Sequence, residues 1–145
     1  MSGCLPCELE HAEASAIAYR DERWACEVAP GYDVPGWFVL RLRRHAEGWD
    51  GLTVEDAAEF GPVSQRLATA LTAATGAPSV YFLSFGENHR HFHFLVIARP
   101  ADLDPALAGA SILTLRSDHR DAALARGVAA DLREALARDR ATASA

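Results

Sequence analysis

The distribution of apolar and polar residues predicts four strands, arranged as two pairs. Residues 23–29 and 37–43 are rich in β-branched and aromatic side chains and flank a loop with two Pro-Gly steps, which predicts strand, loop, strand. Residues 79–85 and 89–99 follow the same pattern and are joined by the short turn Gly86-Glu87-Asn88. Such a short connection predicts an antiparallel hairpin.

Two longer segments show helical periodicity instead. From Thr53, apolar residues recur every three or four positions until Gly76, which predicts one long helix. Thr53 is a suitable N-cap, and Glu55 and Asp56 lie in the first turn, where the helix dipole favours acidic side chains. A second helix is expected over about 118–139. Hairpin strands with two helices outside them predict an α+β fold with an antiparallel sheet.

Composition and charge limit the number of domains and the classes of partner that the protein can have. The 145 residues suit a single domain with one core. The formal net charge of −6 argues against a nucleic-acid partner, since such binding depends on clustered Lys and Arg. No apolar run is long enough to span a membrane, and the N-terminus lacks the features of a signal peptide, so we expect a cytoplasmic protein without a membrane partner.

The cysteines suggest metal chemistry. Cys4 and Cys7 are separated by two residues, a gap that lets both thiolates bind one tetrahedral zinc ion. Such a site needs two more ligands, for which histidines are candidates. A redox pair is the alternative, although the thioredoxin type lies between a strand and a helix. Cys26, within a predicted strand, is expected to be a buried structural thiol.

Three histidines form the second candidate site. His89, His91 and His93 alternate along a predicted strand, so their side chains are expected on one face. Burying three imidazoles together costs stability unless each has a partner, which favours a functional role. A metal site and a nucleophile with supporting donors both fit this pattern, which does not separate them.

Two segments of the chain resemble the histidine-triad (HIT) family. Residues 35–45 resemble the family's block of glycine, strand, basic residue and histidine, and residues 89–95 match its His-φ-His-φ-His-φ-φ signature. With the cysteine pair, the resemblance extends from residue 4 to about residue 99. It implies one HIT-like α+β domain over residues 1–145, with an antiparallel sheet, two main helices and a homodimer that extends the sheet.

The resemblance also implies roles for individual residues. In bacterial members, the cysteine pair, the histidine of the strand block and the first histidine of the triad hold a structural zinc ion. The corresponding residues here are Cys4, Cys7, His45 and His89. The middle histidine attacks the α-phosphate of a nucleotide and forms a covalent nucleotidyl-histidine, and His91 matches that position. His93 would then donate to a phosphoryl oxygen.

The substrate contacts depart from the family pattern. The turn at residues 86–88 replaces the Gly-Gln-Ser/Thr loop common in the family's nucleotide hydrolases. We expect Asn88 to donate to the substrate phosphate, Glu87 to face it, and Arg41, from the basic cluster 41–44, to reach it. Ala29 occupies the position where the family tends to place an acid that binds ribose.

Three functions are consistent with these residues. The main hypothesis is a zinc-stabilised hydrolase or transferase that acts on a phosphate ester, anhydride or phosphoramidate of nucleotide type. A catalytically silent binding domain with the same fold is the first alternative, which the missing ribose acid and the altered turn favour. The second is a metalloenzyme in which triad histidines bind a catalytic ion, which requires a second ion or a different ligand set.

Overall fold

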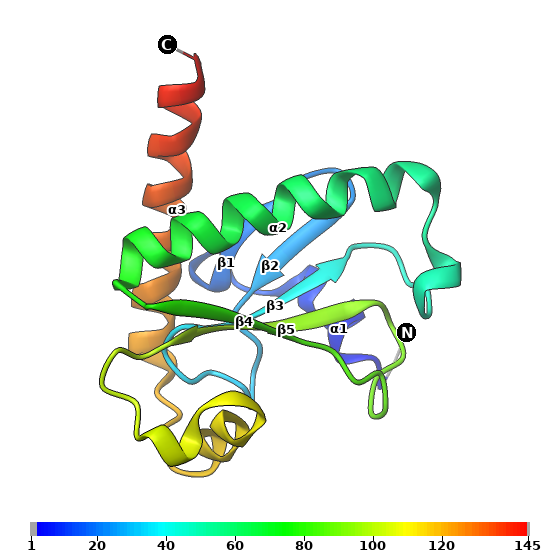
Figure 1. Cartoon of the computed structure of the whole chain (residues 1–145). Coiled ribbons are helices and arrows are strands. Elements are labelled where there is room, and N and C mark those ends of the chain that lie inside the picture. The colour runs from blue at the N-terminus through cyan, green and yellow to red at the C-terminus, as the bar shows by residue number, and fades with distance from the viewer. Residues whose placement is uncertain (1–2, 145) are drawn as a thin grey trace.

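A five-stranded antiparallel sheet organises the computed structural model, which describes residues 3–144 (Figure 1). The sheet has the order β1-β2-β3-β5-β4 and consists of β1 (Ile17–Arg20), β2 (Trp24–Glu27), β3 (Trp37–Leu42), β4 (Ser79–Leu83) and β5 (His93–Arg99). The helices are α1 (Leu5–Glu8), α2 (Val54–Thr75) and α3 (Ala122–Ser144). The expected α+β fold with an antiparallel sheet is therefore confirmed.

Helix α2 begins and ends where its sequence predicts. The Thr53 hydroxyl accepts the Asp56 N–H at 3.0 Å, and the Asp56 carboxylate accepts the Thr53 N–H at 2.8 Å, which completes a capping box. Gly76 ends the helix in the left-handed conformation, with φ of 73°. These signals hold because capping depends on residues that are neighbours in the sequence.

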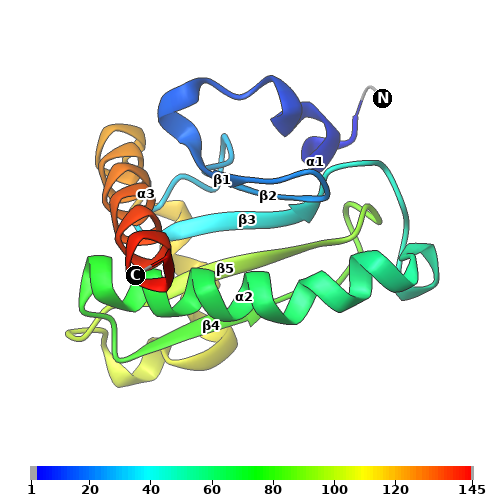
Figure 2. The ribbon, with the colours of Figure 1, turned by 90° about the horizontal axis from the view of Figure 1, so that it is seen from above.

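The main core lies between one face of the sheet and the two long helices. Seen from above, α2 runs along β5 and β4, and α3 crosses near the end of the sheet (Figure 2). Phe38, Leu40 and Val96 project from the strands into this layer. Cys26 belongs to the same core, where burial raises the pKa of its thiol, so the prediction of a buried structural thiol is confirmed.

The opposite face of the sheet is covered by irregular segments. There Trp37, Ile97 and Val39 pack against the N-terminal residues around Leu9 and against a 3₁₀-helical segment, Gly109–Ser117. Figure 1 shows these two segments on the side of the sheet away from α2. Because both faces are covered, the side chains of β2 and β3 are buried along the full length of each strand.

Three elements differ from the sequence-based expectation. Strand β1 was not expected, and α3 extends to residue 144. The last strand begins at His93 instead of residue 89, because the β3–β5 ladder ends with Arg41 opposite His93 and only one bridge, Glu47 to His91, lies beyond it. No helix in the described part of the chain is long and apolar enough to cross a membrane.

Candidate functional site: a metal centre beside an apolar pocket

Four possible metal ligands converge near the N-terminus of the chain. They are Cys4, Cys7, His45 and His91, and their ligand atoms all lie within 4.8 Å of one another. The Cys7 thiol is 3.3 Å from Nδ1 of both histidines, and the Cys4 thiol is 3.5–3.6 Å from the same atoms. Zinc bonds of about 2.3 Å to sulfur and about 2.0–2.1 Å to nitrogen separate such atoms by about 3.5 Å across a tetrahedron. The residues present therefore fit a zinc ion.

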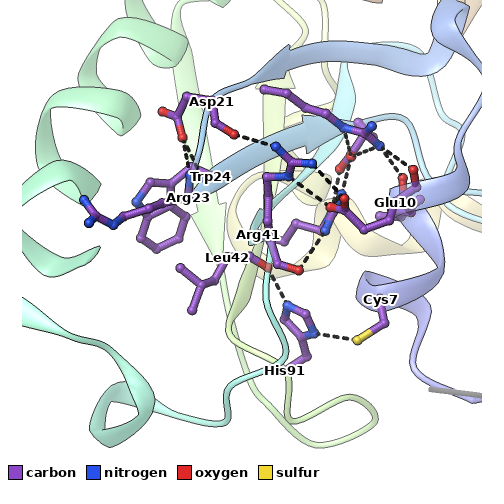
Figure 3. Close-up of polar contacts among 12 residues, drawn as sticks. Cys7, Glu10, Asp21, Arg23, Trp24, Arg41, Leu42 and His91 are labelled. Carbon is purple, nitrogen blue, oxygen red and sulfur yellow. Dashed lines mark hydrogen bonds and ion pairs between the residues drawn. The ribbon is translucent and has the colours of Figure 1, made fainter. Parts of the chain in front are cut away.

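Hydrogen bonds on the far side of each imidazole support this geometry. His91 donates from Nε2 to the carbonyl oxygen of Leu42 at 2.6 Å, which leaves Nδ1 to face the thiols (Figure 3). Nε2 of His45 lies 3.4 Å from a carboxylate oxygen of Glu47. Metal-binding histidines usually have such an acceptor at the second ring nitrogen, because it fixes the tautomer. Burial also lowers the pKa of His91, which favours the neutral ring that binds metal.

The fourth member of the cluster differs from the expected one. The family resemblance implied His89 as a ligand, but the structure places His91 with the two thiols and leaves His89 on the turn before it. The reason is the backbone bridge between His91 and Glu47, which brings His91 beside the loop that carries His45. For the same reason the three histidines do not share one strand face.

Arg41 is also placed differently. Its side chain is fully buried and its guanidinium donates to both carboxylate oxygens of Glu27, at 2.9 and 2.6 Å. Glu10 lies 2.6 Å from the same guanidinium and accepts from Arg43 as well. The expectation that Arg41 reaches a substrate is therefore wrong, because its charge is already neutralised inside the protein.

This ion-pair network holds the N-terminal segment on the sheet. Hydrogen bonds from Arg43, and also from Arg41, lower the pKa of Glu10 to about 2. Arg20 donates to the backbone oxygen of Leu9 at 2.6 Å and to Glu27 at 2.9 Å. The contacts place the segment that carries the two cysteines directly against β2 and β3.

A pocket of about 380 Å³ adjoins the metal centre on the same side of the sheet. Its apolar walls include Trp37, Val39 and Leu95, together with Leu5 and Pro6 from α1. Most of its polar groups come from the hairpin between β4 and β5, which the sequence had indicated. They are Ser84, Glu87, Asn88, His89 and His93.

The side chain of His93 is oriented for chemistry in this pocket. Its Nδ1 lies 2.5 Å from the carbonyl oxygen of His91 and donates to it, because a carbonyl can only accept. The lone pair of Nε2 is therefore left free. Burial lowers the pKa of His93, which favours the neutral ring. A neutral imidazole with one nitrogen held by an acceptor is a competent nucleophile.

Two further residues of the pocket were not found from the sequence. The guanidinium of Arg116 lies 3.9 Å from the centre of the Tyr32 ring, and its Nε donates to the carbonyl oxygen of Gly31 at 2.7 Å. Asp33, near the missing ribose acid, instead accepts from Arg120 at 2.7 Å. Neither Tyr32 nor Arg116 lies in a recognisable motif, so only the fold brings them to the pocket.

Solved structures share this architecture. A zinc-bound histidine-triad protein from Mycobacterium smegmatis superposes with a TM-score of 0.68 and 21% identity over 96% of both chains. A diadenosine triphosphate hydrolase from Plasmodium falciparum gives 0.63 and 11% identity, with 88% of this chain and 80% of that chain covered. A uridylyltransferase mutant gives 0.68 and 22% identity, with 94% of this chain covering 48% of that one. No family model matches the sequence, and no curated protein matches it.

These structures identify the fold. The chain has the architecture of histidine-triad proteins over nearly its whole length, as the two sequence segments had indicated.

Proposed function

We propose that this protein is a zinc-stabilised histidine-triad enzyme that transfers or hydrolyses a nucleotide-type phosphate through a covalent intermediate on His93. The observation that carries the proposal is the orientation of His93, whose Nδ1 is held by a backbone carbonyl while its ring lines the pocket. The similar folds of a uridylyltransferase and a diadenosine triphosphate hydrolase support a phosphate substrate.

The proposal shifts the triad by two residues. The family uses its first histidine for zinc and its middle histidine for attack. In the structure His91 lies in the metal cluster, which makes His93 the middle histidine and Leu95 the third position. This assignment replaces the one in which His89 binds zinc and His91 attacks.

The chemistry follows from the available atoms. Nε2 of His93 attacks phosphorus, a nitrogen–phosphorus bond forms, and the bond from phosphorus to the leaving group breaks with its electron pair on the leaving atom. Water or another acceptor then attacks the phosphorylated histidine and releases the ring. Asn88, at the pocket rim, is proposed to donate to a phosphoryl oxygen during both steps.

The metal has a structural role in this proposal. Two thiolates and two imidazoles complete a four-ligand site and leave no open position for substrate, as in closed structural zinc sites. When bound, the ion would join the N-terminal segment to the loop after β3 and to the start of β5. Every reacting group is then supplied by the protein itself.

Intact-mass analysis tests the proposal directly. The zinc-loaded protein is incubated with nucleoside phosphoramidates and dinucleotides, and a stable adduct of one nucleotidyl or phosphoryl group is expected on His93. His93→Ala should form no adduct while it keeps its zinc and its circular dichroism spectrum. An adduct on another residue, or full turnover by His93→Ala, would refute the mechanism.

A silent binding domain remains the second candidate because Ala29 and Asp33 provide no free acid for ribose. In that case, calorimetry would detect binding of nucleotide ligands, but no covalent adduct and no turnover would appear with any substrate. Metal stoichiometry distinguishes both of these candidates from a metalloenzyme with a catalytic ion, because that enzyme needs an additional ion per chain.

The proposed enzyme is expected to be a homodimer in the cytoplasm. Strand β4 is the outermost strand of the sheet beyond β5, so a second copy could pair with its free edge. Sedimentation equilibrium measures the association directly, and a monomer at all concentrations would contradict it.

A further inference from the structure

Two imidazoles lie in the same pocket, and only one of them has a role so far. The ring centres of His89 and His93 are 6.4 Å apart, with an angle of 66° between the planes. Both residues line the pocket, and both are half-buried. The pair is too far apart for a hydrogen bond between the rings, so neither ring satisfies the other.

The two rings have different partners. His93 donates to the carbonyl oxygen of His91. The ring of His89 has no hydrogen bond to any residue that the structure describes, although it is near His93 and partly removed from water. Its nitrogens therefore remain available to a bound molecule.

The spacing suits a phosphoryl group that lies across both rings. A nucleophile in an attack geometry is about 3–3.5 Å from the atom that it attacks. A donor then lies about 2.7–3.0 Å from the oxygen or nitrogen that it contacts. With a bond of about 1.6 Å from phosphorus to the leaving atom, the path from the attacking nitrogen to the donor nitrogen is about 7–8 Å. This path is longer than the 6.4 Å between the ring centres, so the group would lie across both rings, with its leaving atom within reach of His89.

The next residue on the same face of β5 cannot donate a hydrogen bond to the leaving atom. Leu95 follows His93 with the same side-chain direction and lines the pocket with an apolar group. A leaving atom that departs from phosphorus develops negative charge, which needs a hydrogen-bond donor. The turn that carries His89 is therefore the nearest source of an imidazole donor.

We propose that His89 donates a hydrogen bond to the leaving atom during attack by His93. As the bond from phosphorus to the leaving atom breaks, the electron pair stays on that atom. The leaving atom takes up a proton through the hydrogen bond, and His89 regains one from water. The inference rests on the proposed function, because it assigns the leaving-group side of the same reaction.

The substrates that need this contact are those with poor leaving groups. Alkoxide and amine leaving groups depend strongly on stabilisation, whereas 4-nitrophenolate carries its charge well by itself. The pocket is therefore expected to process alkyl esters and phosphoramidates, and the contribution of His89 should grow as the leaving group becomes more basic.

The test compares leaving groups in matched variants. Nucleoside 5′-phosphate 4-nitrophenyl esters and the corresponding alkyl esters are followed in single-turnover reactions with wild type, His89→Ala, His89→Gln and His93→Ala. Loss of one transition-state donor typically costs about 10²–10³-fold in rate. His89→Ala should show that loss with alkyl esters and less than about a tenfold loss with the activated ester. His89→Gln, which keeps an N–H donor, should recover part of the rate.

His119→Ala is the matched control, because this histidine is exposed and lies outside the pocket. It should react like wild type with both esters. Equal losses for both esters in His89→Ala, or loss of zinc from that variant, would overturn the role of His89 as the leaving-group donor. The proposed attack by His93 would be unaffected. Absence of any adduct in wild type, even with the activated ester, would overturn both this inference and the proposed function.

Discussion

The ring of His93 donates to the backbone carbonyl of His91, while the ring of His91 faces the two thiols. One residue therefore supplies a side chain of the candidate metal site and the acceptor that fixes the tautomer of the residue two positions on. Any change that displaces His91 is expected to disturb His93 as well. The metal centre and the proposed nucleophile are linked through a single stretch of backbone.

The ligand set gives the first prediction. His91→Ala should lose its zinc, because it removes one of four converging ligands, whereas His89→Ala should retain one zinc per chain. Atomic emission on freshly purified proteins measures both. Chelation should also lower the thermal midpoint of wild type, since binding stabilises the folded state. Zinc retained in His91→Ala and lost in His89→Ala would restore the assignment implied by the family resemblance.

The buried ion pair gives the second prediction. Glu27→Gln leaves the charge of Arg41 inside the protein with only part of its compensation. Breaking a buried pair in this way costs about 3–5 kcal/mol in the free energy of unfolding. Urea denaturation measures the loss. Glu134→Gln, which changes an exposed pair with Arg138, should alter stability by less than about 0.5 kcal/mol.

The third prediction concerns acid stability. The pKa of Glu10 is about 2 in the folded protein, below its ordinary value of 4.5. A lowered carboxyl pKa stabilises the folded state above the ordinary value, and this contribution is lost as the pH falls from about 4.5 towards 2. Metal-stripped wild type should thus exceed Glu10→Gln in stability by a constant amount above pH 5 or so, and the difference should shrink in acid. A pH-independent difference would contradict it.

The fourth prediction concerns the charge at the pocket rim. If Glu87 repels a bound phosphate, Glu87→Gln should bind inorganic phosphate more tightly, by about two- to fivefold at low salt, because Coulomb energies in water are about 1 kcal/mol at contact distance. The gain should decrease as salt is added. Glu55→Gln, in the first turn of α2, is the control. Weaker binding by the Glu87 variant would instead identify a direct contact.

Local signals in the sequence predicted much of the fold. Thr53 and Gly76 mark the ends of α2, and the hairpin of β4 and β5 follows from its short turn. These features depend on residues that are close in the sequence. Strand β1 escaped prediction because it is only four residues long and its burial pattern does not alternate clearly.

The site was predictable in kind but not in detail. Alternation gives His89 and His91 the same side-chain direction, yet it cannot show that β5 begins only at His93, because that depends on where β3 ends. Arg41 was expected to reach the substrate, since nothing near it in the sequence reveals that Glu27 lies beside it on the neighbouring strand. Both differences arise from long-range pairing.

The position of Leu5 and Pro6 has a further consequence. These residues lie between the two cysteines of the metal centre and also form part of the pocket wall. Thermodynamic coupling between two binding events is reciprocal. A molecule that packs against Leu5 and Pro6 should therefore raise the affinity of the chain for zinc, and a zinc-depleted chain should bind that molecule more weakly by the same free energy.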